Sequence, residues 1–180
     1  MAVRTLHKHP DQVLRQKAKK VPVVDKSIKT LIDDMVETMI VCNGCGLAAP
    51  QVGVSLRCIV IGMPDEEPFA IINPEIVKRV GEREVEEGCL SVPDLMGDVK
   101  RSMSVIVKGL DRYGKPMRVK GKALLGQALE HEIDHLNGVL FIDRVESPSK
   151  LHKKEQPINS VEVDARDLIK TENEKDLTAI

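Results

Sequence analysis

The sequence has very few aromatic residues and no long apolar run. Only 2% of its 180 residues are aromatic, and Trp is absent. Any core must therefore be built from Val, Ile, Leu, Met and Ala. No apolar run reaches the length that spans a bilayer, and the first twelve residues contain no apolar segment of the kind that directs secretion. We therefore expect a cytoplasmic protein without a membrane-spanning segment.

An excess of charge of one sign is also lacking. The 27 Lys and Arg residues nearly balance the 28 Asp and Glu residues, which leaves a net charge of −1. No basic block stands out, so the sequence argues against extended nucleic-acid binding. The number of cysteines is too small for a disulfide framework, and we expect packing residues or ligands at Cys42, Cys45, Cys58 and Cys89.

The remaining composition is that of a globular protein, with 42% apolar and 31% charged residues. The length fits one compact domain, and a monomer is the default expectation. From Ser147 onward the sequence becomes polar and highly charged. We predict a catalytic domain over residues 1–147 and a charged tail over residues 148–180. The tail is expected to form a solvated helix around 164–170 or to be largely disordered, and a partly ordered segment is favoured.

Two segments show the apolar spacing of amphipathic helices. The first covers residues 27–41, with Asp25 or Ser27 as its N-cap, and the second covers residues 122–137, with Gly138 just beyond its end. Short apolar runs at residues 56–61 and 69–72 predict strands. The runs at 105–110 and 116–119 flank a turn at 111–114 and predict a hairpin.

The strongest local motif is His131-Glu132-Ile133-Asp134-His135 within the second helix. Residues four apart lie on one face of a helix, so both imidazoles can bind one ion. Glu132 follows His131 directly, so it lies on an adjoining side of the helix. There it can act as a base on a metal-bound water without being a ligand. A surface helix with these residues by chance is the alternative, but the motif lies in a periodic apolar helix, which favours a metal site.

A third ligand is needed, and several candidates exist. An extended HExxHxxGxxH motif fails because its last position is Phe141. A zinc endopeptidase of the HExxH type would use a downstream Glu, for which Glu146, Glu155 and Glu162 are available. Upstream, the segment EGCLSVP contains Cys89, whose thiolate is a stronger donor than a carboxylate to a borderline-soft ion.

The segment GLAAPQVG, residues 46–53, follows the first predicted helix and is rich in small residues. It places the neutral amide of Gln51 where it can donate hydrogen bonds to an oxyanion without competing for the metal. A tight turn after a helix is the simpler explanation of this segment, and both remain open from the residues alone.

Together, GLAAPQVG, EGCLSVP and QALEHEIDHLNG closely resemble, in this order, the three signature motifs of bacterial peptide deformylases. The resemblance covers most of residues 1–147. It implies an α+β fold in which antiparallel sheets pack around a central HExxH helix. It also implies removal of the N-formyl group from the initiator N-formylmethionine of nascent polypeptides, with release of formate.

The resemblance also implies roles for individual residues. Cys89, His131 and His135 would hold the metal, and Glu132 would be the general base and then the acid. Gln51 and the backbone N–H of Leu90 would stabilise the oxyanion. Substrate contacts would come from the backbone of Cys45, Gly46 and Gly88, and from pocket-wall positions Val85, Leu124, Ala128 and His131.

The same resemblance points to Fe²⁺ as the native metal, with Zn²⁺, Ni²⁺ or Co²⁺ able to occupy the site. The expected partners are N-formylmethionyl peptides. Contact of the charged tail with the ribosome is a hypothesis from family analogy, since no basic patch in the tail supports it.

Overall fold

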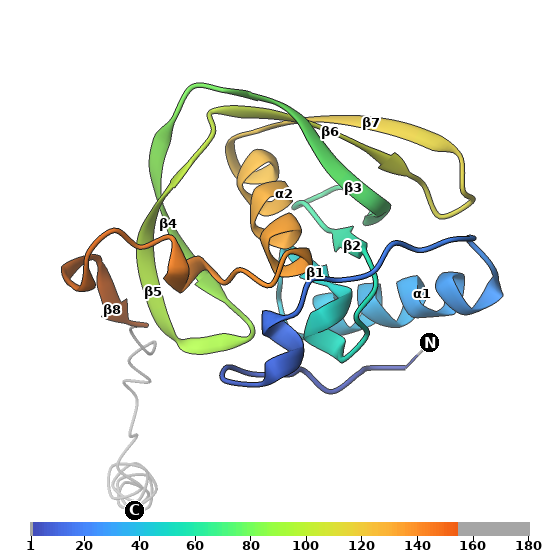
Figure 1. The fold of residues 1–180 in the computed structure, drawn as a ribbon, viewed down its shortest axis with the longest axis horizontal. Coiled ribbons are helices and arrows are strands. Elements are labelled where there is room, and N and C mark those ends of the chain that lie inside the picture. The colour runs from blue at the N-terminus through green and yellow to red at the C-terminus, as the bar shows by residue number, and fades with distance from the viewer. Residues whose placement is uncertain (1, 155–180) are drawn as a thin grey trace, which may run out of the picture.

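The computed structural model describes residues 2–154, which form two antiparallel sheets and two α-helices (Figure 1). The larger sheet has the order β1-β2-β3-β6-β7, and the smaller has the order β4-β5-β8. This arrangement confirms the expected α+β class. The strands are β1 Gly46–Ala48, β2 Cys58–Ile61, β3 Phe69–Val80, β4 Arg83–Cys89, β5 Val92–Arg101, β6 Ser104–Leu110, β7 Pro116–Lys122 and β8 Leu151–Lys153.

Helix α1, Lys26–Val41, begins where the sequence predicts. The side chain of Asp25 accepts a hydrogen bond from the backbone N–H of Ile28, which makes Asp25 the N-cap. Its apolar stripe is buried against β2 and the segment around β1, and includes Ile28, Leu31, Ile32, Met35 and Met39. The helix ends before Asn43, whose φ of 52° turns the chain toward β1.

Helix α2, Ala123–Leu136, contains the whole HExxH motif and packs on the inner face of the larger sheet (Figure 1). Its buried side chains Leu129, Ile133 and Leu136 meet Val105 and Val107 of β6 in one core cluster. Gly138 has a φ of 74°, and a Cβ there would lie 2.6 Å from the backbone oxygen of Arg15. The predicted helix and its terminal glycine are thus confirmed to within one residue.

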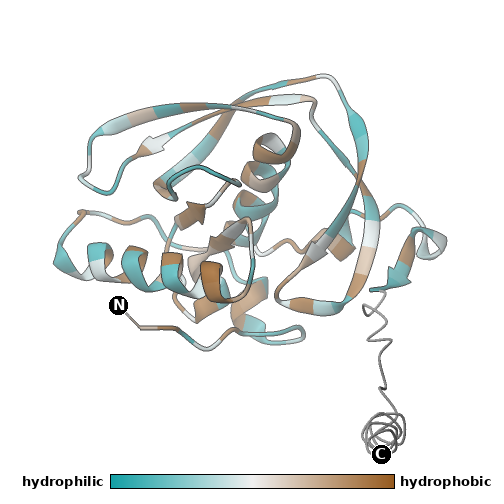
Figure 2. Cartoon of the chain, turned by 180° about the vertical axis from the view of Figure 1, so that it is seen from behind, coloured by the Kyte–Doolittle hydropathy of each residue, from teal (hydrophilic) through white to brown (hydrophobic). Residues whose placement is uncertain are grey.

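The strands between residues 73 and 101 are longer than the sequence predicts. β3 continues eight residues beyond the predicted 69–72, and β4 and β5 form a long antiparallel hairpin where no strand is predicted. Figure 2 shows why: the strands at the centre of the molecule are mostly brown, whereas these outer strands mix teal and brown. Half-exposed strands held by backbone pairing carry little apolar periodicity.

The small sheet continues past residue 147. Residues Pro148–Lys150 form a single 3-10 turn, and β8 then pairs with β5 through Leu95, Met96 and Gly97. The side chain of Leu151 packs against the core cluster that contains Val92, Val99 and Phe141. This part of the predicted tail is therefore built into the fold, whereas the predicted helix at 164–170 lies outside the described residues.

Candidate metal centre

A cavity of about 460 Å³ opens where the segment after α1, the β4–β5 hairpin and α2 meet. Three separate parts of the chain supply its wall, and two of them carry the motifs around Gln51 and Cys89. The cavity brings together most of the predicted site residues: Cys45, Gly46, Gln51, Gly88, Cys89, Leu90, Leu124, Ala128, His131 and Glu132.

Three potential metal ligands converge at the inner end of this cavity. The ligand atoms of Cys89, His131 and His135 all lie within 4.8 Å of one another. Cys89 Sγ is 3.2 Å from His135 Nε2. The two histidines come from successive turns of α2, and the cysteine comes from the end of β4. A thiolate and two imidazoles are a donor set that suits a borderline-soft divalent ion.

The ring of His131 is oriented by a carboxylate behind it. His131 Nδ1 lies 2.9 Å from Glu87 Oε2, which leaves Nε2 as the nitrogen able to bind an ion. Burial would lower the pKa of His131, but its bonds to Cys89 and Glu87 outweigh burial and raise it. A cation is therefore favoured at this position, and a bound metal ion would take the place of the second proton of His131.

His135 has the protonation state that a metal ligand requires. Burial, reinforced by the charge of His131, lowers the pKa of His135 well below its ordinary value. A neutral imidazole has a free lone pair, whereas a protonated one cannot bind a metal. His135 is 1% exposed, so little water competes for that position.

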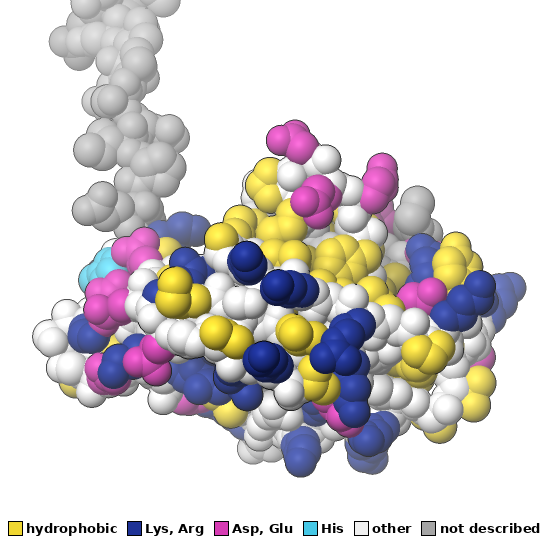
Figure 3. Space-filling view, turned by 90° about the horizontal axis from the view of Figure 1, so that it is seen from above, with side chains coloured by type: hydrophobic (Ala, Val, Ile, Leu, Met, Phe, Trp, Pro, Cys, Tyr) yellow, Lys and Arg dark blue, Asp and Glu magenta, His cyan; other side chains and the backbone are white. Residues whose placement is uncertain are grey.

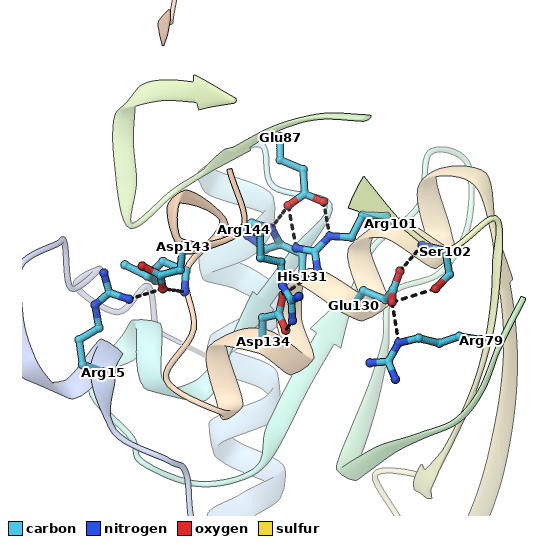
Figure 4. Close-up of polar contacts among 11 residues, drawn as sticks. Arg15, Arg79, Glu87, Arg101, Ser102, Glu130, His131, Asp134, Asp143 and Arg144 are labelled. Carbon is cyan, nitrogen blue, oxygen red and sulfur yellow. Dashed lines mark hydrogen bonds and ion pairs between the residues drawn. The ribbon is translucent and has the colours of Figure 1, made fainter. Parts of the chain in front are cut away.

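A buried ionic network holds Glu87 in place (Figure 4). Arg101 donates from Nε and Nη2 to the two oxygens of Glu87, at 2.8 and 2.9 Å, and from Nη1 to Asp134 at 2.6 Å. Arg144 also binds Asp134. Burial alone would raise the pKa of Glu87, but the bonds to Arg101 and His131 lower it to about 2. Glu87 is therefore ionised and oriented at any physiological pH.

Glu132 is buried beside the ligands but has a free oxygen. Its Oε2 has no hydrogen-bond partner among the described residues, and its side chain lines the cavity. Burial raises its pKa to about 7, so the carboxyl can both accept and release a proton near neutral pH. The backbone of Gly46 lies against it, and a Cβ on Gly46 would be 2.6 Å from Glu132 Oε1.

Gln51 points its amide nitrogen toward the cavity. Its Oε1 accepts a hydrogen bond from the backbone N–H of Ala48 at 2.9 Å, which fixes the direction of the amide. Its Nε2 then lies 3.2 Å from Ser91 Oγ and 3.6 Å from Cys89 Sγ. These two contacts hold the amide nitrogen of Gln51 beside Cys89, at the wall of the cavity.

Some predicted residues lie elsewhere. Val85 is outside the lining of the cavity, because its side chain packs against the core cluster that contains Val92 and Phe141. Glu146, the described candidate for an endopeptidase ligand, pairs instead with Lys100 at 2.6 Å. Glu155 and Glu162 lie outside the described residues.

Sequence reasoning missed the residues that support the ligands. Arg101 lies outside every motif, Asp134 occupies a variable position of the HExxH motif, and only the fold brings β5 against α2. Ser91 lies inside the EGCLSVP motif, yet its contact with Gln51 depends on two segments 40 residues apart. Lys154 also lines the cavity. A charged residue among the apolar positions of a core-facing helix, such as Asp134, is the one signal that the sequence offered.

Comparison with known proteins was consistent across sequences and structures. Residues 3–171 match the family described as Polypeptide deformylase. A peptide deformylase from Dehalococcoides mccartyi is 56% identical over 154 residues, which are 85% of this chain and 92% of that protein. One from Acetivibrio thermocellus is 54% identical over 145 residues, covering 81% and 85% of the two chains.

Solved structures agree with this result. The crystal structure of a peptide deformylase from Legionella pneumophila has a TM-score of 0.80 and 52% identity, covering 83% of this chain and 89% of that one. A peptide deformylase from Synechococcus elongatus in complex with actinonin has a TM-score of 0.79 and 43% identity, covering 82% and 81%.

Proposed function

The chain belongs to the polypeptide deformylase family, and we propose that it hydrolyses the N-formyl group of N-formylmethionyl peptides and releases formate. The observation that carries the proposal is the convergence of Cys89, His131 and His135 within 4.8 Å, beside Glu132, in a cavity open to a peptide. A divalent ion held by these three side chains would act as a Lewis acid and lower the pKa of water from 15.7 toward about 7.

Glu132 is proposed to move the proton. Its raised pKa suits a group that takes a proton from the attacking water and then gives it to the departing amine. As the water oxygen bonds to the formyl carbon, the bond from that carbon to nitrogen breaks and the new amine keeps the proton. The close approach of Gly46 fixes the carboxyl against the cavity wall.

Gln51 and Leu90 are proposed to stabilise the formyl oxygen as it gains negative charge. The side-chain amide of Gln51 is oriented by Ala48, and the backbone N–H of Leu90 belongs to the turn next to Cys89. Fixed donors of this kind need no reorganisation during the reaction. Cys45, Gly46 and Gly88 would bind the peptide through their backbones, while Leu124 and Ala128 would contact the methionine side chain.

Formate release from a formyl-Met peptide tests the proposal directly. The metal-loaded wild type should release formate, and Cys89→Ala should lose both metal and activity. Glu132→Ala should keep its metal and lose activity, because Glu132 acts as a base and not as a ligand. Failure of the metal-loaded wild type, or cleavage at internal peptide bonds, would contradict the proposal. The endopeptidase alternative has no support from the position of Glu146 or from the relatives.

Iron is proposed as the native metal. The thiolate and imidazole donors accept Fe²⁺, Ni²⁺, Co²⁺ or Zn²⁺, and the resemblance to bacterial deformylases favours Fe²⁺. Protein purified without oxygen should contain iron and lose activity in air as the iron and Cys89 oxidise. Stable activity of the iron-loaded protein in air would count against iron, and metal analysis would then identify the ion.

The location and assembly of the protein remain predictions. No helix among residues 2–154 is long and apolar enough to cross a membrane. We propose a cytoplasmic monomer, with 1–147 as the catalytic region, and ribosome contact through the C-terminal segment. Because β8 belongs to the small sheet, ribosome pelleting should compare the full chain with one that ends at Lys154. Equal pelleting would remove the role of that segment.

A further inference from the structure

One face of the larger sheet is positively charged. Side chains alternate between the two faces of a strand, and residues directly paired across strands share a face. Val105 and Val107 point to the core under α2, so their neighbours point outward. The register therefore places on the outward face five exposed cations, which we call the basic face: Lys78, Lys108, Arg118, Lys120 and Lys122.

Acidic groups neutralise little of the basic face. On β3, β6 and β7 the one acid that shares this face is Glu75, which lies 3.1 Å from Lys108 and 3.6 Å from Lys20. Among residues 2–154, no ion pair involves the other four cations. Figure 3, which looks down on these strands, shows Lys and Arg side chains gathered with few acids between them. The net charge of the whole chain is close to zero, so it gives no sign that cations are concentrated on this face.

An exposed aromatic residue lies at one end of the basic face. Tyr113, the only tyrosine in the sequence, occupies the turn between β6 and β7 and is 68% exposed. Lys29 Nζ and Arg112 Cζ lie 5.8 and 5.9 Å from its ring centroid. Arg112 is also bound to Asp33 of α1 at 2.8 Å, which holds the turn against that helix. The ring is thus kept at the surface between cations.

We propose that the basic face binds single-stranded RNA through its phosphate backbone, with Tyr113 as a stacking platform for one base. Alternate residues of β7 place three cations in a row about 6.6–6.8 Å apart, and Lys108 and Lys78 extend this row sideways. A line of exposed cations with an aromatic at its end is the pattern of sequence-tolerant single-strand binding.

A membrane surface fits the basic face less well. Interfacial binding requires a broad apolar side that enters the lipid. The apolar residues that lie among these cations, Val80 and Ile106, are separated from each other by Lys78 and Lys120, and Val80 is 50% exposed. Leu110 also points to this side of the sheet, but its side chain packs against the core cluster under α1. The choice of RNA over DNA rests on the proposed function, because formylated peptides arise where RNA is translated.

Fluorescence anisotropy with a labelled 12-nucleotide RNA tests the proposal, using the full metal-loaded chain. The triple variant Arg118→Gln, Lys120→Gln, Lys122→Gln removes three contacts at exposed positions. Five phosphate contacts give a slope of log K against log salt of about −3.5, and two give about −1.4. The triple variant should therefore bind about 100-fold more weakly at 0.1 M salt. Tyr113→Ala should weaken binding by about fivefold or more without changing the slope.

The matched control is Lys8→Gln, Lys17→Gln, Lys153→Gln, which makes the same charge change at exposed residues away from the basic face. It should bind RNA with nearly the affinity of the wild type. Equal losses in the two triple variants, or no loss in the first, would overturn the proposal. So would tighter binding to single-stranded DNA, or binding to anionic phospholipid vesicles in place of RNA. Formate release by the same samples shows separately whether the catalytic proposal holds.

Discussion

Arg101→Met is expected to destabilise the protein strongly and to weaken metal binding. Arg101 is 3% exposed and binds two carboxylates, Glu87 and Asp134, at 2.6–2.9 Å. The Met side chain has a similar length but no charge, so it leaves Glu87 buried without its counterion. Asp134 keeps its bond to Arg144.

The size of the effect follows from burial. Removal of one partner of a buried ion pair typically costs about 3–5 kcal/mol of unfolding free energy, because a charge remains buried without compensation. For a protein of this length the midpoint of thermal unfolding should fall by about 6–20 °C. Glu87 also orients His131 through Nδ1, so the affinity for the metal should fall about 10- to 100-fold.

Urea unfolding and competition with a chelator measure the two effects. Arg112→Met is a suitable control, because Arg112 also binds a carboxylate, that of Asp33, but the two side chains are 41% and 34% exposed. Exposed pairs contribute about 1 kcal/mol or less. If Arg101→Met and Arg112→Met unfolded at the same urea concentration, or if metal affinity were unchanged in Arg101→Met, the supporting role of this network would be refuted.

Three further predictions concern the site and the cysteines. Gln51→Ala should lower kcat by about 10²–10³ while the metal content stays constant, and a change in KM alone would contradict its oxyanion role. Gly46→Ala should reduce formate release, because the new Cβ would displace the carboxyl of Glu132; full activity would show that the close contact is not needed. Burial raises the pKa of Cys58 to about 12, so iodoacetamide at pH 8 should label the exposed Cys45 in the native protein and leave Cys58 unmodified, as peptide mass mapping would show.

Local features of the fold were predictable from the sequence. Both helices follow from apolar spacing, and their ends follow from Asp25 and Gly138, because caps and periodicity act within a few residues. The long β4–β5 hairpin was missed. Strands that extend beyond the core are stabilised by backbone pairing, which leaves little trace in side-chain pattern.

The site also has a part that the sequence predicts and a part that depends on the tertiary structure. The spacing of His131 and His135 on one helix indicated a shared ligand face, because that geometry is local. Cys89 was one of several possible third ligands; the donor strength of its thiolate favoured it, and the resemblance to a family selected it. Its position beside His135 depends on how β4 packs against α2. The position of Val85, whose side chain packs against the core cluster of Val92 and Phe141, also depends on the tertiary structure, since strand alternation and core packing decide which side chains reach the cavity.

The sequence by itself determined the helices, the two histidines with Glu132 between them, and a balanced total charge. Only the tertiary structure decided which residues support those ligands and where the charges lie. Arg101 meets Glu87 and Asp134 because a strand crosses a helix, and the basic face arises because pleating and register align cations from three strands. Contacts within one turn of a helix are fixed by local geometry, whereas contacts across 14 to 46 residues depend on the packing of whole elements.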